Sequence, residues 1–256
     1  KETEEINTDD MPELERWILS KVAELDAIVR NGYNEYSFQF VFQQLFQFCT
    51  LDLSSFYFDI RKDTLYCDSK NSYTRKACRT VLDILFTRLT TWLAPILAFT
   101  TEEVWYERFK DKATSVHLND FQQTPTDWFD SELERRWSAI RDVRRVVTGA
   151  IEIYRQEKLI GSSLEASPLV YIDDEKLYQK IDSIDFSEVC ITSDIEVRPG
   201  VTKSKSFTLD DVENVQVIFK MSKGHKCQRC WKYVDTFPPN AKYVKTCVRC
   251  DEVLQT

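Results

Sequence analysis

Glycine and histidine are scarce in this chain, and their scarcity excludes several kinds of site. The 256 residues include only five glycines and two histidines. There is no glycine-rich phosphate loop, no Gly-x-Ser-x-Gly nucleophile turn and no His-Glu-x-x-His pair, each of which requires these residues at fixed spacing. The two histidines, His117 and His225, lie far apart along the chain. The sequence therefore carries no catalytic motif of these classes.

Long apolar runs are also absent. No stretch approaches the ~18 consecutive apolar residues of a membrane span, and no cleavable signal is visible after Lys1. The low glycine and proline content, with 43% hydrophobic residues, favours a folded, helix-rich protein over a disordered one. Cys49 and Cys78 are expected on apolar helix faces, as free thiols in a reducing compartment. We therefore expect a cytoplasmic protein of two or three folded units, without a membrane partner.

The net charge of -8 is distributed unevenly. Residues 1–60 contain four basic and twelve acidic side chains, whereas residues 134–160 contain seven basic and four acidic, and residues 201–256 contain ten basic and six acidic. Local fields steer phosphate groups, so the overall negative charge does not exclude RNA as a partner.

Two Cys-x-x-Cys segments near the end of the sequence form its most specific motif. Cys227 and Cys230 are separated by 16 residues from Cys247 and Cys250. Four thiolates at this spacing are typical of a structural site for one Zn²⁺. A pair of disulfides or redox-active cysteines is the alternative. His225 adjoins the first segment and is expected to be a bystander, because four ligands are already present.

Helical periodicity dominates the first 160 residues, after an acidic stretch at residues 1–10 that we expect to be a tail or linker. The apolar spacing and the stop signals predict helices from Pro12 to Asn31-Gly32, from Ser37 to about Ile60, from Ser72 to Pro95, from Thr100 through Trp105, and from Ser131 to Lys158.

Two of these predicted helices have faces that allow more than one interpretation. The second carries aromatic residues, including Phe38, Phe42 and Phe46, which at helical spacing are expected in the core, with a base-stacking surface as the alternative. The last has an outer face rich in arginine. Such a face is usually a solvated one, but an excess of arginine also fits phosphate contact.

The apolar period changes after Gly161. Short strands are predicted at Leu169–Ile172, Val189–Thr192 and Val215–Phe219, around a helix near Glu175–Ile184. The expected fold is therefore mainly α, with a helical domain at residues 11–160, a small α/β junction domain at 161–224 and a four-cysteine zinc module at 225–256.

Five segments carry a resemblance to a known family, and they occur in the family's order: 14–17 (LERW), 55–66 (SFYFDIRKDTLY), 93–105 (LAPILAFTTEEVW), 158–166 (KLIGSSLEA) and the two cysteine segments. Together they resemble the C-terminal portion of bacterial-type isoleucyl-tRNA synthetases, which are class I aminoacyl-tRNA synthetases. The first three segments recur in the valine and leucine relatives, whereas the last two together point to the isoleucine member. Gln228 stands where the family often has proline, and Thr64 where it often has arginine.

This resemblance implies a helical anticodon-binding domain, a junction domain and a zinc module. It also implies a longer parent enzyme, isoleucine-tRNA ligase, whose upstream catalytic domain uses ATP to attach isoleucine to its tRNA. The catalytic and editing domains are missing here, so the fragment alone is expected to be inactive, with no catalytic residue. The expected partners are the anticodon stem-loop of the isoleucine tRNA and the parent's own catalytic domain, and the expected state is monomeric.

The residues expected to contact tRNA are Arg229, Trp231, Lys232, Arg249, Arg141, Arg144, Arg145 and Lys62. Trp231 follows a cysteine directly, so a bound metal would fix its orientation for base stacking; packing against the junction domain is the alternative. Arg229 and Arg249 could donate to phosphate or base edges, or instead to backbone carbonyls or solvent. The rival function is a zinc-stapled protein-interaction module without RNA contact, which the acidic N-terminal third supports.

Overall fold

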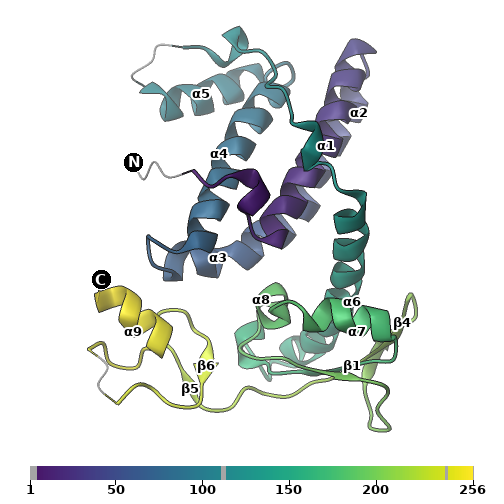
Figure 1. Cartoon of the computed structure of the whole chain (residues 1–256), viewed down its shortest axis with the longest axis vertical. Coiled ribbons are helices and arrows are strands. Elements are labelled where there is room, and N and C mark those ends of the chain that lie inside the picture. The colour runs from purple at the N-terminus through teal and green to yellow at the C-terminus, as the bar shows by residue number, and fades with distance from the viewer. Residues whose placement is uncertain (1–4, 111–113, 240–241, 256) are drawn as a thin grey trace. The chain divides into compact units, whose positions relative to one another are not determined.

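The computed structural model describes residues 5–110, 114–239 and 242–255, which form two compact units. The first unit runs to Leu65 and resumes from Lys70 to Ser131, and the second comprises Tyr66–Ser69 and the chain from Glu132 onward. The fold is mainly helical, as predicted, and the described strands all belong to the second unit (Figure 1). None of the helices in the described ranges is long and apolar enough to cross a membrane.

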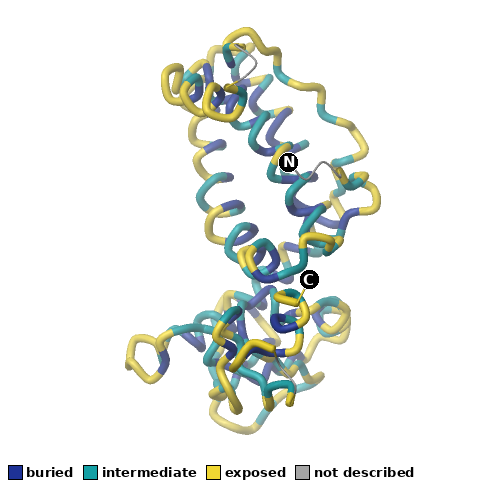
Figure 2. The backbone as a smooth tube through the Cα atoms, turned by 90° about the vertical axis from the view of Figure 1, so that its left-hand side faces the viewer, coloured by how far each residue is buried: buried dark blue, intermediate teal, exposed yellow. Residues whose placement is uncertain are grey.

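The first unit is helical throughout its described elements. Of the expected tail, residues 1–4 lie outside the described residues, and Ile6 N–H donates to Thr80 Oγ1 at 3.1 Å. The helices are α1 (Glu13–Asn34), α2 (Phe38–Gln47), the π-helical segment η2 (Phe48–Tyr57), α3 (Phe58–Cys67), α4 (Tyr73–Leu93) and α5 (Ala98–Arg108). Buried and exposed positions alternate along their turns (Figure 2).

Helix α1 continues through Gly32, where the sequence predicted its end. A Cβ atom at Gly32 would lie 2.4 Å from Cγ2 of Val41, so only glycine allows α2 to approach α1 this closely. The chain instead leaves the helix at Glu35, and Tyr36 takes the left-handed conformation at φ 58°. The glycine thus serves helix packing rather than helix termination.

The helical stretch that begins at Phe38 differs from the prediction in length and in the residues that it buries. It stays helical to Cys67, beyond the predicted end near Ile60, and its middle is π-helical. A π-helical segment rotates the buried face relative to a regular helix. Phe48 and Phe56 are therefore buried, while Phe42 and Phe46 are 41% and 57% exposed.

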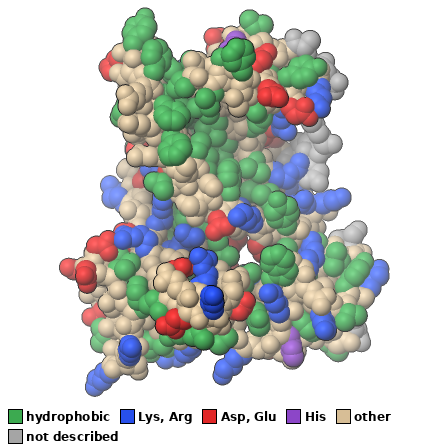
Figure 3. Space-filling view, turned by 180° about the vertical axis from the view of Figure 1, so that it is seen from behind, with side chains coloured by type: hydrophobic (Ala, Val, Ile, Leu, Met, Phe, Trp, Pro, Cys, Tyr) green, Lys and Arg blue, Asp and Glu red, His purple; other side chains and the backbone are tan. Residues whose placement is uncertain are grey.

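The expectation that the aromatic stripe lies in the core is therefore wrong for α2. Phe38, Phe40, Phe42 and Phe46 are all exposed, and the Phe42 and Phe46 rings stack with centroids 6.0 Å apart. In the view from behind, hydrophobic side chains gather over the part formed by α2 (Figure 3). This face has no cationic side chain on α2 itself.

Two arginines hold the extended chain between α5 and the next helix. Arg88 donates to the carbonyls of Gln122 and Gln123 at 3.2 and 3.1 Å and to Thr124 Oγ1 at 2.6 Å. Arg30 donates to the Gln122 carbonyl at 2.6 Å, and Asp26 accepts from Arg30 at 2.8 Å. These charge-assisted bonds satisfy carbonyls of a segment that has little regular structure of its own.

The second unit contains a long helix and a four-stranded sheet. Its elements are α6 (Ser131–Gln156), β1 (Leu169–Ile172), α7 (Glu175–Asp182), α8 (Phe186–Cys190), β2 (Glu196–Pro199), β3 (Phe207–Leu209) and β4 (Val212–Ile218). The strand order is β2-β1-β4-β3, with β1 parallel to β2 and antiparallel to β4. Strands β1 and β4 and helices α6 and α7 confirm the predictions, whereas β2 and β3 were not predicted.

The strand predicted at Val189–Thr192 is wrong, because the segment is the end of α8 and a turn. Asp185 caps this helix: its Oδ1 accepts from Ser187 Oγ at 2.6 Å and from Glu188 N–H at 3.1 Å. Burial alone would raise the pKa of Asp185, but these hydrogen bonds and the charge of Lys232 outweigh it and lower the pKa. Ile191 then reverses the chain at φ 56°. The local cap outweighs the strand preference of the apolar residues.

A buried ion pair joins α1 to α3 in the core of the first unit. Arg61 Nε and Nη2 donate to the two carboxylate oxygens of Glu15 at 2.6 and 2.7 Å, and both side chains are almost fully buried. Tyr57 also donates to Glu15 at 3.2 Å. Burial and the Glu15 charge raise the pKa of Tyr57 well above its usual value, so the phenol remains a donor.

We predict that Arg61→Ala lowers the free energy of unfolding by about 3–5 kcal/mol, because it leaves the Glu15 charge buried without its partner. Urea denaturation followed by circular dichroism measures this. Lys62→Ala is the matched control on the same helix: the Lys62–Asp59 pair is exposed, so its loss should change stability by less than about 1 kcal/mol. Equal effects of the two substitutions would contradict the assigned importance of the buried pair.

Candidate functional site

The C-terminal part of the second unit arranges both cysteine segments around short regular elements. Strands β5 (His225–Lys226) and β6 (Tyr233–Val234) pair in antiparallel fashion, and the first cysteine segment lies between them. The second segment leads into helix α9 (Val248–Gln255). Gly224, at φ 90°, starts the hairpin where a Cβ atom would lie 2.3 Å from the Val234 carbonyl oxygen. The hairpin therefore needs glycine at this position.

The four predicted cysteines converge. One sulfur from each of Cys227, Cys230, Cys247 and Cys250 lies within 4.8 Å of the others, and all four residues are buried. The Cys230 and Cys247 sulfurs are 3.8 Å apart. Zn–S bonds of ~2.3 Å in a tetrahedron place sulfurs about 3.8 Å apart, so the donor set and its spacing fit one four-coordinate zinc. All four are free thiols in the structure rather than disulfides.

Backbone hydrogen bonds tie the two cysteine segments together. Cys247 N–H donates to Cys227 Sγ at 3.3 Å, and Gln228 N–H donates to the Lys245 carbonyl at 3.0 Å. A hydrogen bond with the Cys250 thiol and burial raise the pKa of the Cys230 thiol to about 12. A cation entering this cluster would therefore have to displace protons, as zinc binding to thiols generally does.

The arginines inside the two cysteine segments both contact the segment Tyr66–Ser69, which includes the last residues of α3 and belongs to the second unit. Arg229 donates to the Cys67 and Tyr66 carbonyls at 2.6 and 3.1 Å. Arg249 pairs with Asp68 at 3.3 Å. Cys67 itself is buried in the cluster formed by the four cysteines. Arg229 thus has the backbone-carbonyl partners that the sequence left open, whereas Arg249 has a carboxylate partner that was not predicted. Contact of either arginine with tRNA remains a prediction.

The other residues expected in this region differ in exposure. The Trp231 side chain is 60% exposed, so it does not pack inside the unit. Its backbone adopts φ 66°, and its N–H donates to the Cys227 carbonyl at 3.0 Å. Lys232 is half-buried, and its carbonyl accepts from Cys227 N–H at 2.9 Å. An exposed indole held by the cysteine segment is the arrangement that stacking requires.

The arginines of α6 mainly contact its own unit. Arg144 Nε donates to the Val189 carbonyl at 2.9 Å, and Arg145 pairs with Asp211 at 2.7 Å and with Asp142 at 3.2 Å. The hydrogen bond with Asp211 is the main reason why the pKa of Arg145 is raised. Arg141 is half-buried on the same helix. Phosphate contact by these three residues is a prediction that these contacts leave untested.

Lys62 is the one predicted contact outside this unit. It lies on α3 in the first unit and pairs with Asp59 at 2.8 Å, with its side chain 63% exposed. Its contact with tRNA also remains a prediction.

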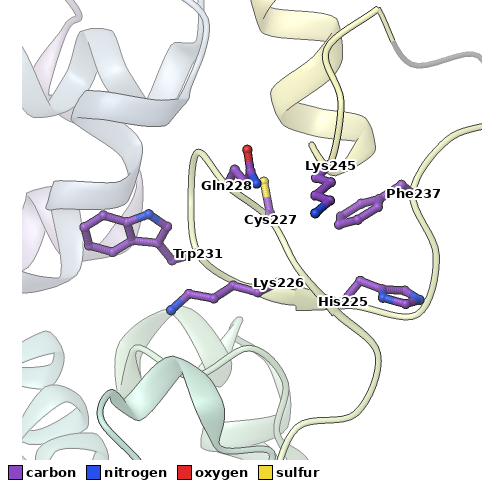
Figure 4. Close-up of a pocket in the computed structure, with 7 residues that line it drawn as sticks. All are labelled: His225, Lys226, Cys227, Gln228, Trp231, Phe237 and Lys245. Atoms are coloured by element: carbon purple, nitrogen blue, oxygen red, sulfur yellow. The ribbon is translucent and has the colours of Figure 1, made fainter.

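Most of the residues around an open pocket beside the first cysteine segment were not predicted from the sequence. This pocket, of about 550 Å³, is lined by His225, Lys226, Cys227, Gln228, Trp231, Phe237 and Lys245 (Figure 4). Only Trp231 and Cys227 were singled out for a site from the sequence. The available signal was the set of cationic and aromatic residues flanking the cysteines, but only folding brings Phe237 and Lys245 to His225.

Comparison with known proteins identifies one family and several related proteins. The family model for the anticodon-binding domain of tRNA ligase matches residues 15–170. An isoleucine-tRNA ligase of Ruegeria pomeroyi is 51% identical over 245 residues, which cover 96% of this chain and 25% of that protein. Isoleucine-tRNA ligases of Brucella abortus and Agrobacterium fabrum are each 47% identical over 91% and 94% of this chain.

The chain spans about a quarter of the length of these curated relatives. The family match covers more than half of the chain, including all the helices from α2 to α6. On this evidence the chain belongs to the family of anticodon-binding domains of tRNA ligases.

Proposed function

We propose that this chain is the tRNA-recognition part of an isoleucine-tRNA ligase and binds the anticodon stem-loop of the isoleucine tRNA. The observation that carries the proposal is the 47–51% identity to proteins of that name over 91–96% of the chain. The longer protein would attach isoleucine to its tRNA using ATP in a catalytic domain outside this chain. We further propose that it acts as a cytoplasmic monomer, with this part docked to that catalytic domain.

In the proposed binding mode, different side chains contact the phosphates and the bases of the tRNA. Trp231 offers an exposed ring to an unstacked base, and Lys232 lies next to it in the chain. Arg229, Arg249, Arg141, Arg144, Arg145 and Lys62 are the remaining proposed tRNA contacts. Both terminal nitrogens of Arg229 already donate to backbone carbonyls. We therefore assign Arg229 first to orienting the cysteine segment and only second to contacting tRNA.

One structural Zn²⁺ is part of the proposal, held by Cys227, Cys230, Cys247 and Cys250. When bound, it would crosslink the two cysteine segments and would leave no open position for catalysis. The buried sulfurs and their spacing support this assignment. The hairpin, Trp231 and the Arg229 contact with the end of α3 would then depend on the metal.

A second candidate function is a zinc-stapled protein-interaction module without direct RNA contact. The exposed aromatic face of α2 favours it, because Phe38, Phe42 and Phe46 form an uncharged surface unsuited to phosphate. The two candidates differ in their dependence on Trp231, which the variant below tests.

We predict that the chain binds isoleucine tRNA with an affinity that falls steeply with salt, because each phosphate contact releases counterions. Filter binding at several salt concentrations measures the slope. A tRNA with an altered anticodon should bind about 5- to 150-fold more weakly, since each lost hydrogen-bonding contact to a base edge costs about 1–3 kcal/mol. A flat salt response, or equal affinity for any tRNA, would refute RNA recognition by this chain.

We predict that removing the metal with a chelator unfolds residues 225–255 and also loosens Tyr66–Ser69. Zinc binding contributes roughly 10 kcal/mol to folding in small zinc-finger peptides, and Arg229 and Arg249 connect the metal site to this segment. Hydrogen-exchange measurements should show faster amide exchange in both regions and unchanged amide exchange rates in α1 and α4. Faster exchange throughout the helical unit would instead show that the metal supports the whole chain.

We predict that Trp231→Gly weakens tRNA binding about 5- to 150-fold, as loss of one stacked base does, without destabilising the module. Glycine relaxes the left-handed backbone at φ 66°, which costs a tryptophan about 1 kcal/mol. Tyr243→Ala is the matched control, an exposed aromatic of the same module. Unchanged tRNA affinity in Trp231→Gly, with zinc retained by mass spectrometry, would favour the protein-interaction module.

A further inference from the structure

The pocket beside the first cysteine segment is lined mainly by aromatic and cationic side chains. Its described lining includes three rings and two lysines and contains no carboxylate. Lys226 and Lys245 are both exposed, and neither forms an ion pair within the described residues. His225 and Trp231 are exposed, and Phe237 is half-buried. Cations that form no ion pair within the described ranges, placed beside such rings, are groups that can bind a single-stranded nucleic acid through its phosphates and bases.

The pocket has two aromatic sides rather than one. In the close-up, Trp231 lies on one side, and the Lys226 side chain extends toward that side (Figure 4). His225 and Phe237 lie on the opposite side with ring centroids 5.5 Å apart, and Lys245 lies beside Phe237. Gln228 lies between the two sides. Each aromatic side therefore has a lysine of its own.

The backbone is strained where it presents two of these side chains. Trp231 and Lys245 adopt φ values of 66° and 61°, a conformation that glycine adopts without cost. Hydrogen bonds hold both positions: Trp231 N–H donates to Cys227, and the Lys245 carbonyl accepts from Gln228 N–H. Strain maintained in this way is typical of functional sites, where the side chain rather than the backbone is required.

We propose that this pocket binds two consecutive unstacked nucleotides of a single-stranded RNA loop. One base stacks on Trp231 with its phosphate at Lys226, and the next stacks on the His225–Phe237 pair with its phosphate at Lys245. The Gln228 amide, which can both donate and accept, faces the base edges between them. The inference rests on the proposed function and adds a second nucleotide site to it.

The test compares two lysine-aromatic pairs of the same module in filter binding of isoleucine tRNA. The pocket variant is Phe237→Leu with Lys245→Ala. The control is Tyr243→Leu with Lys242→Ala, because Lys242 lies 5.8 Å from the Tyr243 ring centroid and neither residue lines the pocket. We expect at least a tenfold loss of affinity for the pocket variant and less than a twofold loss for the control. Equal losses would overturn the inference.

The salt dependence separates the two contributions on the second side. Lys245→Ala alone should reduce the slope of log affinity against log salt by about 0.7, the value for one phosphate of a single strand. Phe237→Leu alone should weaken binding without changing that slope. A slope that does not respond to Lys245→Ala would show that this lysine contacts no phosphate and would overturn the assignment.

A double-mutant cycle distinguishes two nucleotides from one base held between both sides. If Trp231 and Phe237 contact different bases, the losses of binding free energy from Trp231→Gly and Phe237→Leu add. The affinity loss of the double variant then equals the product of the single losses within about twofold. A shared base gives a combined loss clearly smaller than the product of the single losses, and that result would contradict a two-nucleotide site. Zinc content of each variant, measured by mass spectrometry, confirms that the module remains folded.

A titration of the chain with single-stranded hexauridylate tests the pocket separately from tRNA recognition. We expect the ring NMR signals of both His225 and Trp231 to shift during the titration. If tRNA binds but neither ring responds and the pocket variant binds normally, the inference fails while the proposed function stands. If tRNA does not bind at all, the proposed function fails, and absence of both ring shifts would then also overturn the pocket.

Discussion

The convergence of four buried sulfurs is the constraint on which the candidate site of this structure depends. A hairpin of two-residue strands and an eight-residue helix have too little apolar surface to hold a fixed geometry alone. The cysteine cluster supplies that geometry, and the hydrogen bond between Gln228 and Lys245 connects the two segments. The exposed Trp231 and the open pocket are positioned by this small buried centre.

Arginine and lysine side chains have different roles in the second unit. Arg229, Arg144 and Arg136 donate to backbone carbonyls, so they stabilise the unit from within. A planar guanidinium suits this task, since several fixed donors satisfy carbonyls at once. Lys226 and Lys245 remain exposed beside the pocket. A flexible ammonium is suited to a phosphate that approaches from solvent, so the lysines are the better candidates for the proposed RNA contacts.

The same use of buried charge occurs in the first unit. Glu15 and Arg61 fix α1 against α3, and Arg88 holds the chain around Gln122. Both features come from residues that look like ordinary helix-surface charges in the sequence. Their partners lie 46 and 34 positions away, so no local pattern reveals them. Charge patterns alone therefore overestimate how many cations are available to an RNA partner.

Sequence by itself determined the mainly helical fold, most helix positions and the four-cysteine cluster, because apolar periodicity and cysteine spacing are local signals. It could not determine which aromatics are buried, because the π-helical segment Phe48–Tyr57 rotates the buried face along this helical stretch, and Phe42 and Phe46 lie outside the buried face of α2. Nor could it show that Gly32 continues a helix, since that depends on the approach of Val41. Only the tertiary structure brought Phe237 and Lys245 to His225, because the pocket forms from three separate segments that the cysteine cluster draws together.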